Sequence, residues 1–132
     1  MSRLPNWENR LALTLAQWRG RQFRWDADCA RYLAAVTIAV TGEDPLADLR
    51  GQYRTKREAL ALLSQKPMAS WLDDRFPRVP IALAQRGDIA LADDMHLGCV
   101  IGGEALFFTE TGFLGPTPRS DWQGVWGVGR DG

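Results

Sequence analysis

The sequence predicts an α+β fold, with helices in the first half of the chain and an antiparallel sheet in the second. Helical periodicity and helix caps extend to about residue 75, and short strand-like runs separated by turn residues follow. Grouping the helices ahead of the strands is typical of the α+β class. The 132 residues suffice for one core and are too few for two, so we expect a single domain over residues 1–132.

Two helices are predicted near the N-terminus. The first begins after Pro5 with Asn6 as its N-cap and ends at Gly20, and its apolar residues recur at spacings of three and four. The second covers about residues 29–41 and ends at Gly42. Because the second helix is apolar on almost every side, we expect it to be buried in the middle of the domain.

The middle of the chain carries shorter signals. A turn or short helix is expected over residues 44–51. Thr55 and Glu58 form a capping box ahead of a helix over 59–64. Three prolines then interrupt residues 67–80, which we expect to be mainly loop.

The second half predicts an antiparallel sheet whose strands are joined by tight turns. Asp93-Asp94 forms one turn, and Gly102-Gly103 is a two-residue hairpin loop. Five runs have strand character: 89–92, 96–101, 105–109, 113–114 and 125–128.

Composition excludes several classes of partner and location. Lys+Arg and Asp+Glu balance at 16 each, so the chain lacks the basic surface that nucleic acid or an anionic membrane requires. No apolar run is long enough to span a membrane, and the N-terminus shows no signal peptide. Two cysteines do not make a disulfide framework. We therefore expect a chain that stays in a cytoplasm or leaves it inside a larger assembly.

Six tryptophans are a high number for this length, and three lie near the chain ends, at Trp7, Trp122 and Trp126. Two interpretations stay open. In the favoured one, these rings close a small core. In the other, they form an assembly surface, where tryptophan is enriched.

Cys29 and His96 are the candidate catalytic residues. Cys29 lies in the first turn of the apolar helix, where unpaired backbone N–H groups and the helix dipole favour a thiolate. His96 is the only histidine and lies on a predicted strand. A thiol and an imidazole are the smallest set from which a cysteine nucleophile is built.

The strand that begins at His96 separates its side chains onto two faces. Leu97 and Cys99 share the core face, so Cys99 is expected to be a small buried residue rather than a reactive thiol. His96 lies on the opposite face beside the small residue Gly98, which leaves room for another group. A two-residue hairpin loop sets Thr109 across from His96, where a group that orients the imidazole is expected.

Three motifs resemble those of the NlpC-type papain-like cysteine peptidases, which are bacterial cell-wall endopeptidases. Residues 23–32 (Phe-Arg-Trp-Asp-Ala-Asp-Cys-Ala-Arg-Tyr) are similar to that family's signature, aromatic-x-aromatic followed by Asp-Cys-Ser-Gly-Phe. Residues 87–91 are similar to its Gly-Asp-Leu-Val-Phe strand, and residues 96–102 to its His-Val-Gly-Ile-Tyr-Leu-Gly strand. The resemblance covers about residues 23–110. It implies a papain-like (NlpC-type) fold, in which a central buried helix packs on a C-terminal antiparallel sheet.

The chain also resembles a narrower family of small proteins encoded in phages and prophages. That family's patterns are Trp-Gly-x-x-Asp-Cys-Ala, Thr-Gly-x-Asp-Pro and Gly-x-Tyr-x-Thr, and the runs similar to them here are 25–30, 41–45 and 51–55. The similarity spans nearly the full length. It implies association with a phage tail, with tail-tip or hub proteins as partners, in the virion or in the host cytoplasm before assembly.

The peptidase resemblance implies a role for each candidate residue. Cys29 is the nucleophile that attacks an amide of a peptidoglycan stem peptide, and His96 takes the proton and returns it to the leaving amine. Thr109 is the third, orienting member. The resemblance implies no cofactor, and no metal site is expected because Cys99 points away from Cys29 and His96.

The chain departs from the NlpC pattern at three places, which keeps a second hypothesis open. The third catalytic position falls on Phe108 or Thr109 instead of His, Asn or Gln. Phe23 replaces a tyrosine, and Asp26 replaces a glycine. In the second hypothesis, the protein is a catalytically degenerate structural component of the tail, a tail-tip assembly protein.

Overall fold

The computed structural model describes residues 1–22, 28–49 and 51–130 of the chain. Its helices are α1 (Trp7–Arg19), α2 (Asp28–Thr41), α3 (Lys56–Leu63) and α4 (Met68–Asp73), and short 3-10 turns lie at Ile81–Leu83 and Arg119–Asp121. The α+β class predicted from the sequence is confirmed. Its strands are β1 (Arg78–Val79), β2 (Ile89–Ala92), β3 (His96–Val100), β4 (Glu104–Phe108), β5 (Leu114–Pro118) and β6 (Gly124–Trp126).

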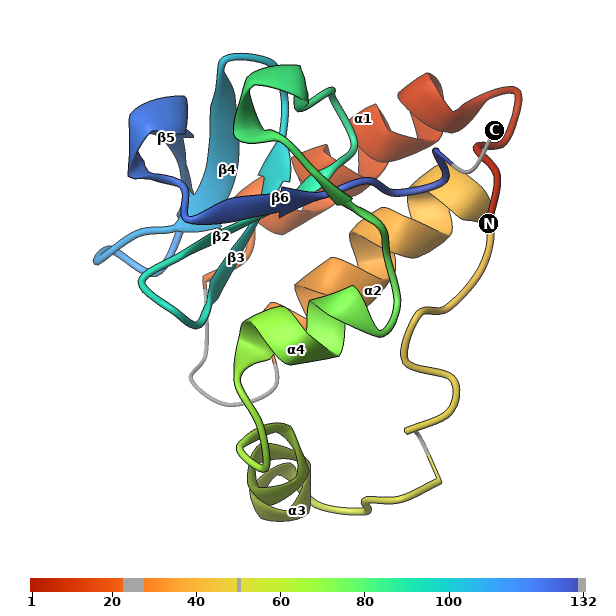
Figure 1. Cartoon of the computed structure of the whole chain (residues 1–132), viewed down its shortest axis with the longest axis vertical. Helices are drawn as coiled ribbons and strands as arrows, with labels where there is room; N and C mark the ends of the chain where they lie inside the picture. The colour runs from red at the N-terminus through yellow and green to blue at the C-terminus, as the bar shows by residue number, and fades with distance from the viewer. Residues whose placement is uncertain (23–27, 50, 131–132) are drawn as a thin grey trace.

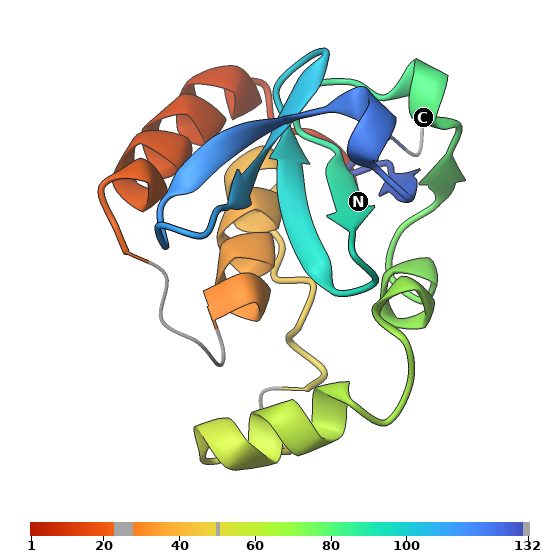
Figure 2. The same ribbon diagram turned by 90° about the vertical axis from the view of Figure 1, so that its left-hand side faces the viewer.

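The described strands form one antiparallel sheet in the order β1-β6-β2-β3-β4-β5 (Figures 1 and 2). The β3–β4 hairpin has the predicted loop, because the N–H of Ile101 donates to the carbonyl oxygen of Glu104 over 2.9 Å across Gly102-Gly103. The last strand, β6, inserts between β1 and β2. The segment that reaches Trp126 therefore lies inside the sheet rather than at its edge.

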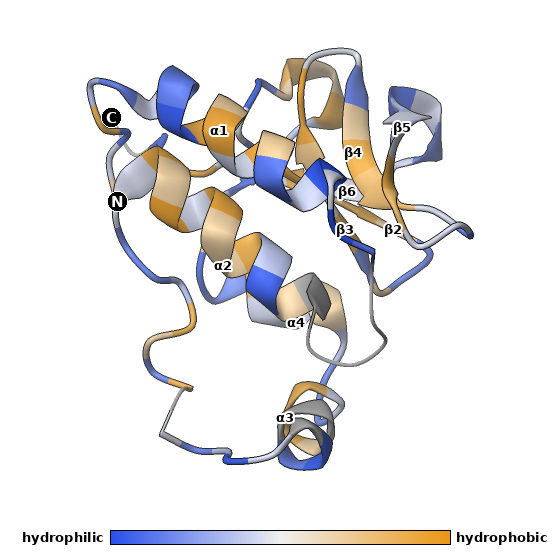
Figure 3. Cartoon of the chain, turned by 180° about the vertical axis from the view of Figure 1, so that it is seen from behind, coloured by the Kyte–Doolittle hydropathy of each residue, from blue (hydrophilic) through white to orange (hydrophobic). Residues whose placement is uncertain are grey.

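Helices α1 and α2 lie side by side on one face of the sheet (Figures 1 and 3). Polar residues lie along the outward surface of α1, whereas α2 is apolar on most sides, as predicted. The hydroxyl of Tyr32 in α2 donates to the carbonyl oxygen of Leu106 in β4 over 2.9 Å and fixes α2 against the sheet. The helix-side core between these layers includes Leu11, Leu15, Trp18, Tyr32, Leu33, Val36, Leu72, Ile89, Leu91, Leu97, Cys99, Leu106 and Trp126.

The opposite face of the sheet is also buried, under the segments that flank β1 and β6. This outer core consists of Ala90, Ala92, Val100, Ala105, Phe107, Trp122 and Val125. The space expected directly at Gly98 is therefore filled by the ring of Phe107, whereas an open depression remains beside His96. A Cβ atom at Gly98 would lie 2.6 Å from the ring of Phe107.

Tryptophan burial favours the core interpretation of these residues. Trp122 and Trp126 are 5% and 1% exposed, so neither offers a free ring to a partner. The guanidinium of Arg119 lies 5.5 Å from the ring of Trp122, and that of Arg78 lies 4.7 Å from the ring of Trp126. Trp7 is only partly buried and lies under the guanidinium of Arg3 at 4.3 Å.

The segment between α2 and β2 agrees with the sequence prediction only in part. The capping box is confirmed, because the N–H of Glu58 donates to Thr55 Oγ1 over 3.2 Å at the start of α3. The loop expected over residues 67–80 is wrong in part, since α4 and β1 lie within it. Pro67 directly precedes the first residue of α4, where its missing N–H costs nothing, and Leu72 of α4 is buried. Helix α3 lies farther from the sheet than the other helices (Figures 1 and 2).

Candidate functional site

Cys29 is the second residue of α2, so its backbone lies in the first turn of the central helix, as predicted. Its side chain is outside the part of the chain that the structure describes. Residues 23–27, which carry Phe23 and Asp26 of the motif, lie outside the described residues as well. The helix position alone brings unpaired backbone N–H groups to this end of α2.

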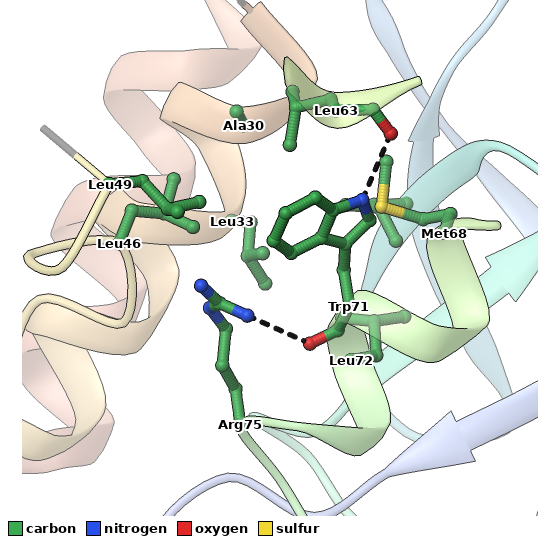
Figure 4. A pocket seen from close by; sticks show the side chains of 10 residues that line it. Ala30, Leu33, Leu46, Leu49, Leu63, Met68, Trp71, Leu72 and Arg75 are labelled. Atoms are coloured by element: carbon green, nitrogen blue, oxygen red, sulfur yellow. Dashed lines mark hydrogen bonds between the residues drawn. The ribbon is translucent and has the colours of Figure 1, made fainter. Parts of the chain in front are cut away.

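A small apolar cavity lies between the beginning of α2 and the segments around α3 and α4 (Figure 4), and one residue of the sheet also lines it. Ala30 and Leu33 of α2 line it together with Leu97 of β3, and its volume is about 20 Å³, enough for about one water molecule. Leu97 directly follows His96 in the chain. The first turn of α2 and the first residues of β3 therefore lie at the same end of the molecule. The remaining lining comes from Leu46, Leu49, Leu63, Met68, Trp71, Leu72 and Arg75.

His96 is the first residue of β3 and is paired with Ala92 of β2. Its side chain is 54% exposed, and its Nδ1 lies 3.6 Å from Oδ2 of Asp93. Because side chains alternate along a strand, His96 lies on the same face of the sheet as Gly98. Leu97 and Cys99 lie on the opposite face, in the helix-side core against α2. The imidazole and the start of α2 therefore lie on opposite faces of the sheet, and the two can meet only around the end of β3.

Thr109 directly follows β4, and the pairing of β3 with β4 is described at Cys99–Leu106 and Val100–Ala105. Cys99 pairs with Leu106, and the same register continued along the hairpin sets Thr109 opposite His96. The hydroxyl of Thr109 is 2.9 Å from the carbonyl oxygen of Phe113 and 2.8 Å from Thr111 Oγ1. His96 and Thr109 line one open depression, whose other residues are Asp93, Leu97, Phe108, Glu110 and Thr117.

Cys99 is fully buried in the helix-side core, as the strand pattern predicts. Burial raises the pKa of its thiol to about 12, since an ionised sulfur is poorly solvated there. At neutral pH this thiol is therefore protonated and unreactive. Chemical labelling of the native protein then reports on Cys29.

Asp93 is the residue that sequence reasoning placed only in a turn and that the structure places beside His96. Asp93 and Asp94 have φ values of 50° and 63°, the left-handed conformation that a tight hairpin turn requires. An aspartate three residues before a histidine, in a three-residue turn that reverses the chain, is the signal that could have indicated the pair. The strand register alone favoured Thr109 as the residue that orients His96.

Neither a metal site nor a membrane-spanning helix is found in the described ranges. Within residues 1–22, 28–49 and 51–130, no three His, Cys, Asp or Glu side chains gather as ligands. Of the helices described, none combines the length and the apolar character that crossing a bilayer needs.

One family model matches residues 2–128 of the chain, and its description reads "Domain of unknown function (DUF6950)". The chain belongs to this family. Comparison with curated proteins and with solved structures finds no match. The DUF6950 match spans both α2 and the hairpin that carries His96, so the whole candidate site lies within the family's domain.

Proposed function

We propose that this DUF6950 protein is a phage tail-tip-associated, NlpC-like cysteine peptidase that cuts peptidoglycan stem peptides during cell-wall penetration. The proposal includes a papain-like fold, with α2 as the central helix packed on the antiparallel sheet. One observation carries it: the cavity lined by Ala30, Leu33 and Leu97 brings the start of α2 to the start of β3. This juxtaposition supports a site built from Cys29 and His96. The motif resemblance supports the substrate and the tail location.

In the proposed reaction, His96 Nε2 takes the proton of the Cys29 thiol, and the sulfur attacks the carbonyl carbon of the scissile amide. The negative charge on the oxygen is stabilised by backbone N–H groups at the start of α2, that of Cys29 among them. Collapse breaks the C–N bond, and His96 gives the proton to the leaving amine. Water then hydrolyses the thioester with His96 as base, which releases a carboxylate and restores the thiol.

Digestion of defined muropeptides by the purified protein tests the proposal. We expect mass spectrometry to show cleavage of one amide by the native protein and no cleavage by Cys29→Ala. A matched control, Cys99→Ala, keeps the candidate nucleophile and should still cleave. Lack of cleavage by the native protein on a full set of stem-peptide substrates, with normal thermal unfolding, contradicts the proposal.

A second function is favoured by the position of His96. Its side chain lies on the sheet face away from α2, and the Thr109 hydroxyl already bonds Phe113 and Thr111. A catalytically degenerate structural component of the tail needs neither group. This alternative expects Cys29→Ala phage to assemble and infect normally, with the protein present in tails at fixed stoichiometry. Loss of infection by Cys29→Ala phage with intact tails argues for the peptidase instead.

A further inference from the structure

We propose that Asp93, rather than Thr109, is the residue that orients the imidazole of His96. The inference rests on the proposed function, since the orientation of His96 matters only where the imidazole acts as a base. It assigns Asp93 as a positioning residue that acts through His96. The argument depends on three features: the contact itself, the anchoring of the turn, and the engagement of Thr109 elsewhere.

The contact joins Asp93 Oδ2 to His96 Nδ1 over 3.6 Å. A carboxylate is a stronger acceptor for an imidazole N–H than a neutral hydroxyl is. At 3.6 Å the two atoms form an ion-pair contact rather than a hydrogen bond, and a carboxylate this close to Nδ1 favours the hydrogen on Nδ1, which leaves the lone pair of Nε2 free to accept a proton. Asp93 therefore selects the tautomer that a base acting through Nε2 requires.

The turn that presents Asp93 is anchored at both ends. The N–H of Met95 donates to the carbonyl oxygen of Ala92 over 3.3 Å, which closes the hairpin. The N–H of Asp94 donates to Oε1 of Gln123 over 2.6 Å, and Nε2 of Gln123 donates back to Oδ1 of Asp94 over 2.9 Å. Gln123 in turn donates its own N–H to the carbonyl oxygen of Leu91 over 2.8 Å. Held in this way, the turn fixes the backbone of Asp93 three residues ahead of His96.

Thr109 occupies the position across from His96, but its hydroxyl is already engaged. Its oxygen lies within hydrogen-bond distance of the carbonyl oxygen of Phe113 and of Thr111 Oγ1. A hydroxyl has one hydrogen, which Thr109 gives to one of these two oxygens. Its contacts therefore serve the β4–β5 turn, whereas the carboxylate of Asp93 lies against His96.

The tautomer of His96 can be read directly, because it is the only histidine in the chain and gives a single imidazole in ¹⁵N NMR spectra. In the untagged native protein, above the titration of the imidazole, we expect the hydrogen to reside mainly on Nδ1. Asp93→Gly, which keeps the left-handed turn and removes the carboxylate, should move it mainly to Nε2. Glu110→Gln removes a charge from the same depression without touching His96 and is the matched control.

Thr109→Val decides between the two candidates. An unchanged tautomer ratio in Thr109→Val, with a shifted ratio in Asp93→Gly, supports the assignment. A shift in Thr109→Val with no shift in Asp93→Gly overturns it. Asp93→Asn serves as a second variant, because asparagine also tolerates the left-handed conformation if the glycine variant is poorly folded.

Iodoacetamide labelling of Cys29 separates failure of this inference from failure of the proposed function. We expect Asp93→Gly to slow labelling by up to about fivefold, as an exposed pair allows, and Glu110→Gln to leave the rate unchanged. If His96→Ala slows labelling and Asp93→Gly changes neither the rate nor the tautomer, the positioning role fails and the function stands. If labelling is indifferent to His96→Ala, the proposed function fails, and the positioning role fails with it.

Discussion

Two aspartates flank the same short strand, β2, and their surroundings are opposite. Asp88 precedes the strand and is fully buried, whereas Asp93 follows it with a side chain that is 84% exposed. The strand between them is only four residues long. One carboxylate therefore belongs to the architecture of the protein and the other is available for chemistry.

The buried carboxylate is saturated with partners. Asp88 Oδ1 lies 3.1 Å from Nη2 of Arg3, and Oδ2 lies 2.5 Å from Nη1 of Arg130. The backbone N–H groups of Gln85 and Val128 donate to it over 2.8 Å and 3.2 Å. These contacts join both chain ends to the turn before β2, next to the bridge between Ser2 and Arg130. A carboxylate with this many donors has no capacity left for a substrate.

The exposed carboxylate of Asp93 lies 3.6 Å from His96 Nδ1 and is otherwise largely open to solvent. An exposed pair of this kind contributes little to folding, because water competes for both charges. The comparison shows that charge alone does not mark a functional aspartate. What distinguishes the two is whether the carboxylate has capacity and access left after the fold has formed.

The largest expected effect lies at the buried end. Asp88→Asn leaves two guanidinium groups beside a neutral side chain, so we expect the free energy of unfolding to fall by about 3–5 kcal/mol. Urea denaturation followed by circular dichroism measures the change. The matched control is Asp93→Asn, which removes the same charge from the other end of β2. Equal losses in the two variants would contradict the comparison.

The second-largest effect is expected at Gly98, where a substitution tests how tightly the outer core is packed. Gly98→Ala places a methyl group against the ring of Phe107, and overpacking of this kind costs about 1–3 kcal/mol. Gly103→Ala is the control, since a Cβ there meets no atom within 4 Å. Urea denaturation should separate the two variants. A Gly98→Ala protein as stable as Gly103→Ala would contradict the close packing of Phe107 against Gly98.

Cys99 pairs with Ile89, the residue that follows Asp88. Its buried thiol should make the free energy of unfolding depend on pH in the alkaline range. The folded thiol has a pKa of about 12 against an ordinary value of 9.0, so above pH 9 the unfolded chain loses its proton first. The native state then binds more protons, and stability falls as pH rises from 9 toward 12. At pH 10 this amounts to about 1.4 kcal/mol.

Comparison with Cys99→Ala isolates the contribution of Cys99 from those of other groups that titrate in this range. The substitution also removes packing, so the slope of stability against pH is compared rather than its absolute value. We expect a shallower slope in the variant between pH 9 and 11. Parallel slopes would show that the thiol ionises equally in both states.

The smallest expected effect on stability lies at the exposed end. Asp93→Asn should change the free energy of unfolding by less than about 0.5 kcal/mol, because the carboxylate is solvated in both states. Thermal unfolding measured at low and high salt gives the value. A loss above 1 kcal/mol would show that Asp93 holds the β2–β3 turn together, which would make its role structural.

Local signals in the sequence predicted most of the elements. Apolar periodicity and the terminal glycines predicted α1 and α2, and the cap at Thr55 predicted α3, because these signals act within one or two helical turns. Asn6 stands at the N-cap position of α1, but its side chain makes no capping hydrogen bond. The turn residues Asp93-Asp94 and Gly102-Gly103 gave both hairpins and the register that sets Thr109 across from His96. The burial of Cys99 also followed from alternation alone. Whether this arrangement is catalytic stays a prediction.

Only the tertiary structure decided which of these elements meet. The insertion of β6 between β1 and β2 depends on pairing between residues more than thirty positions apart, and no local pattern specifies it. The same packing buries Asp88 between the two chain ends and fills the space beside Gly98 with Phe107. The sequence presents Asp88 and Asp93 as similar turn residues. Their difference arises because contacts formed across the whole chain close over one end of β2 and leave the other in water.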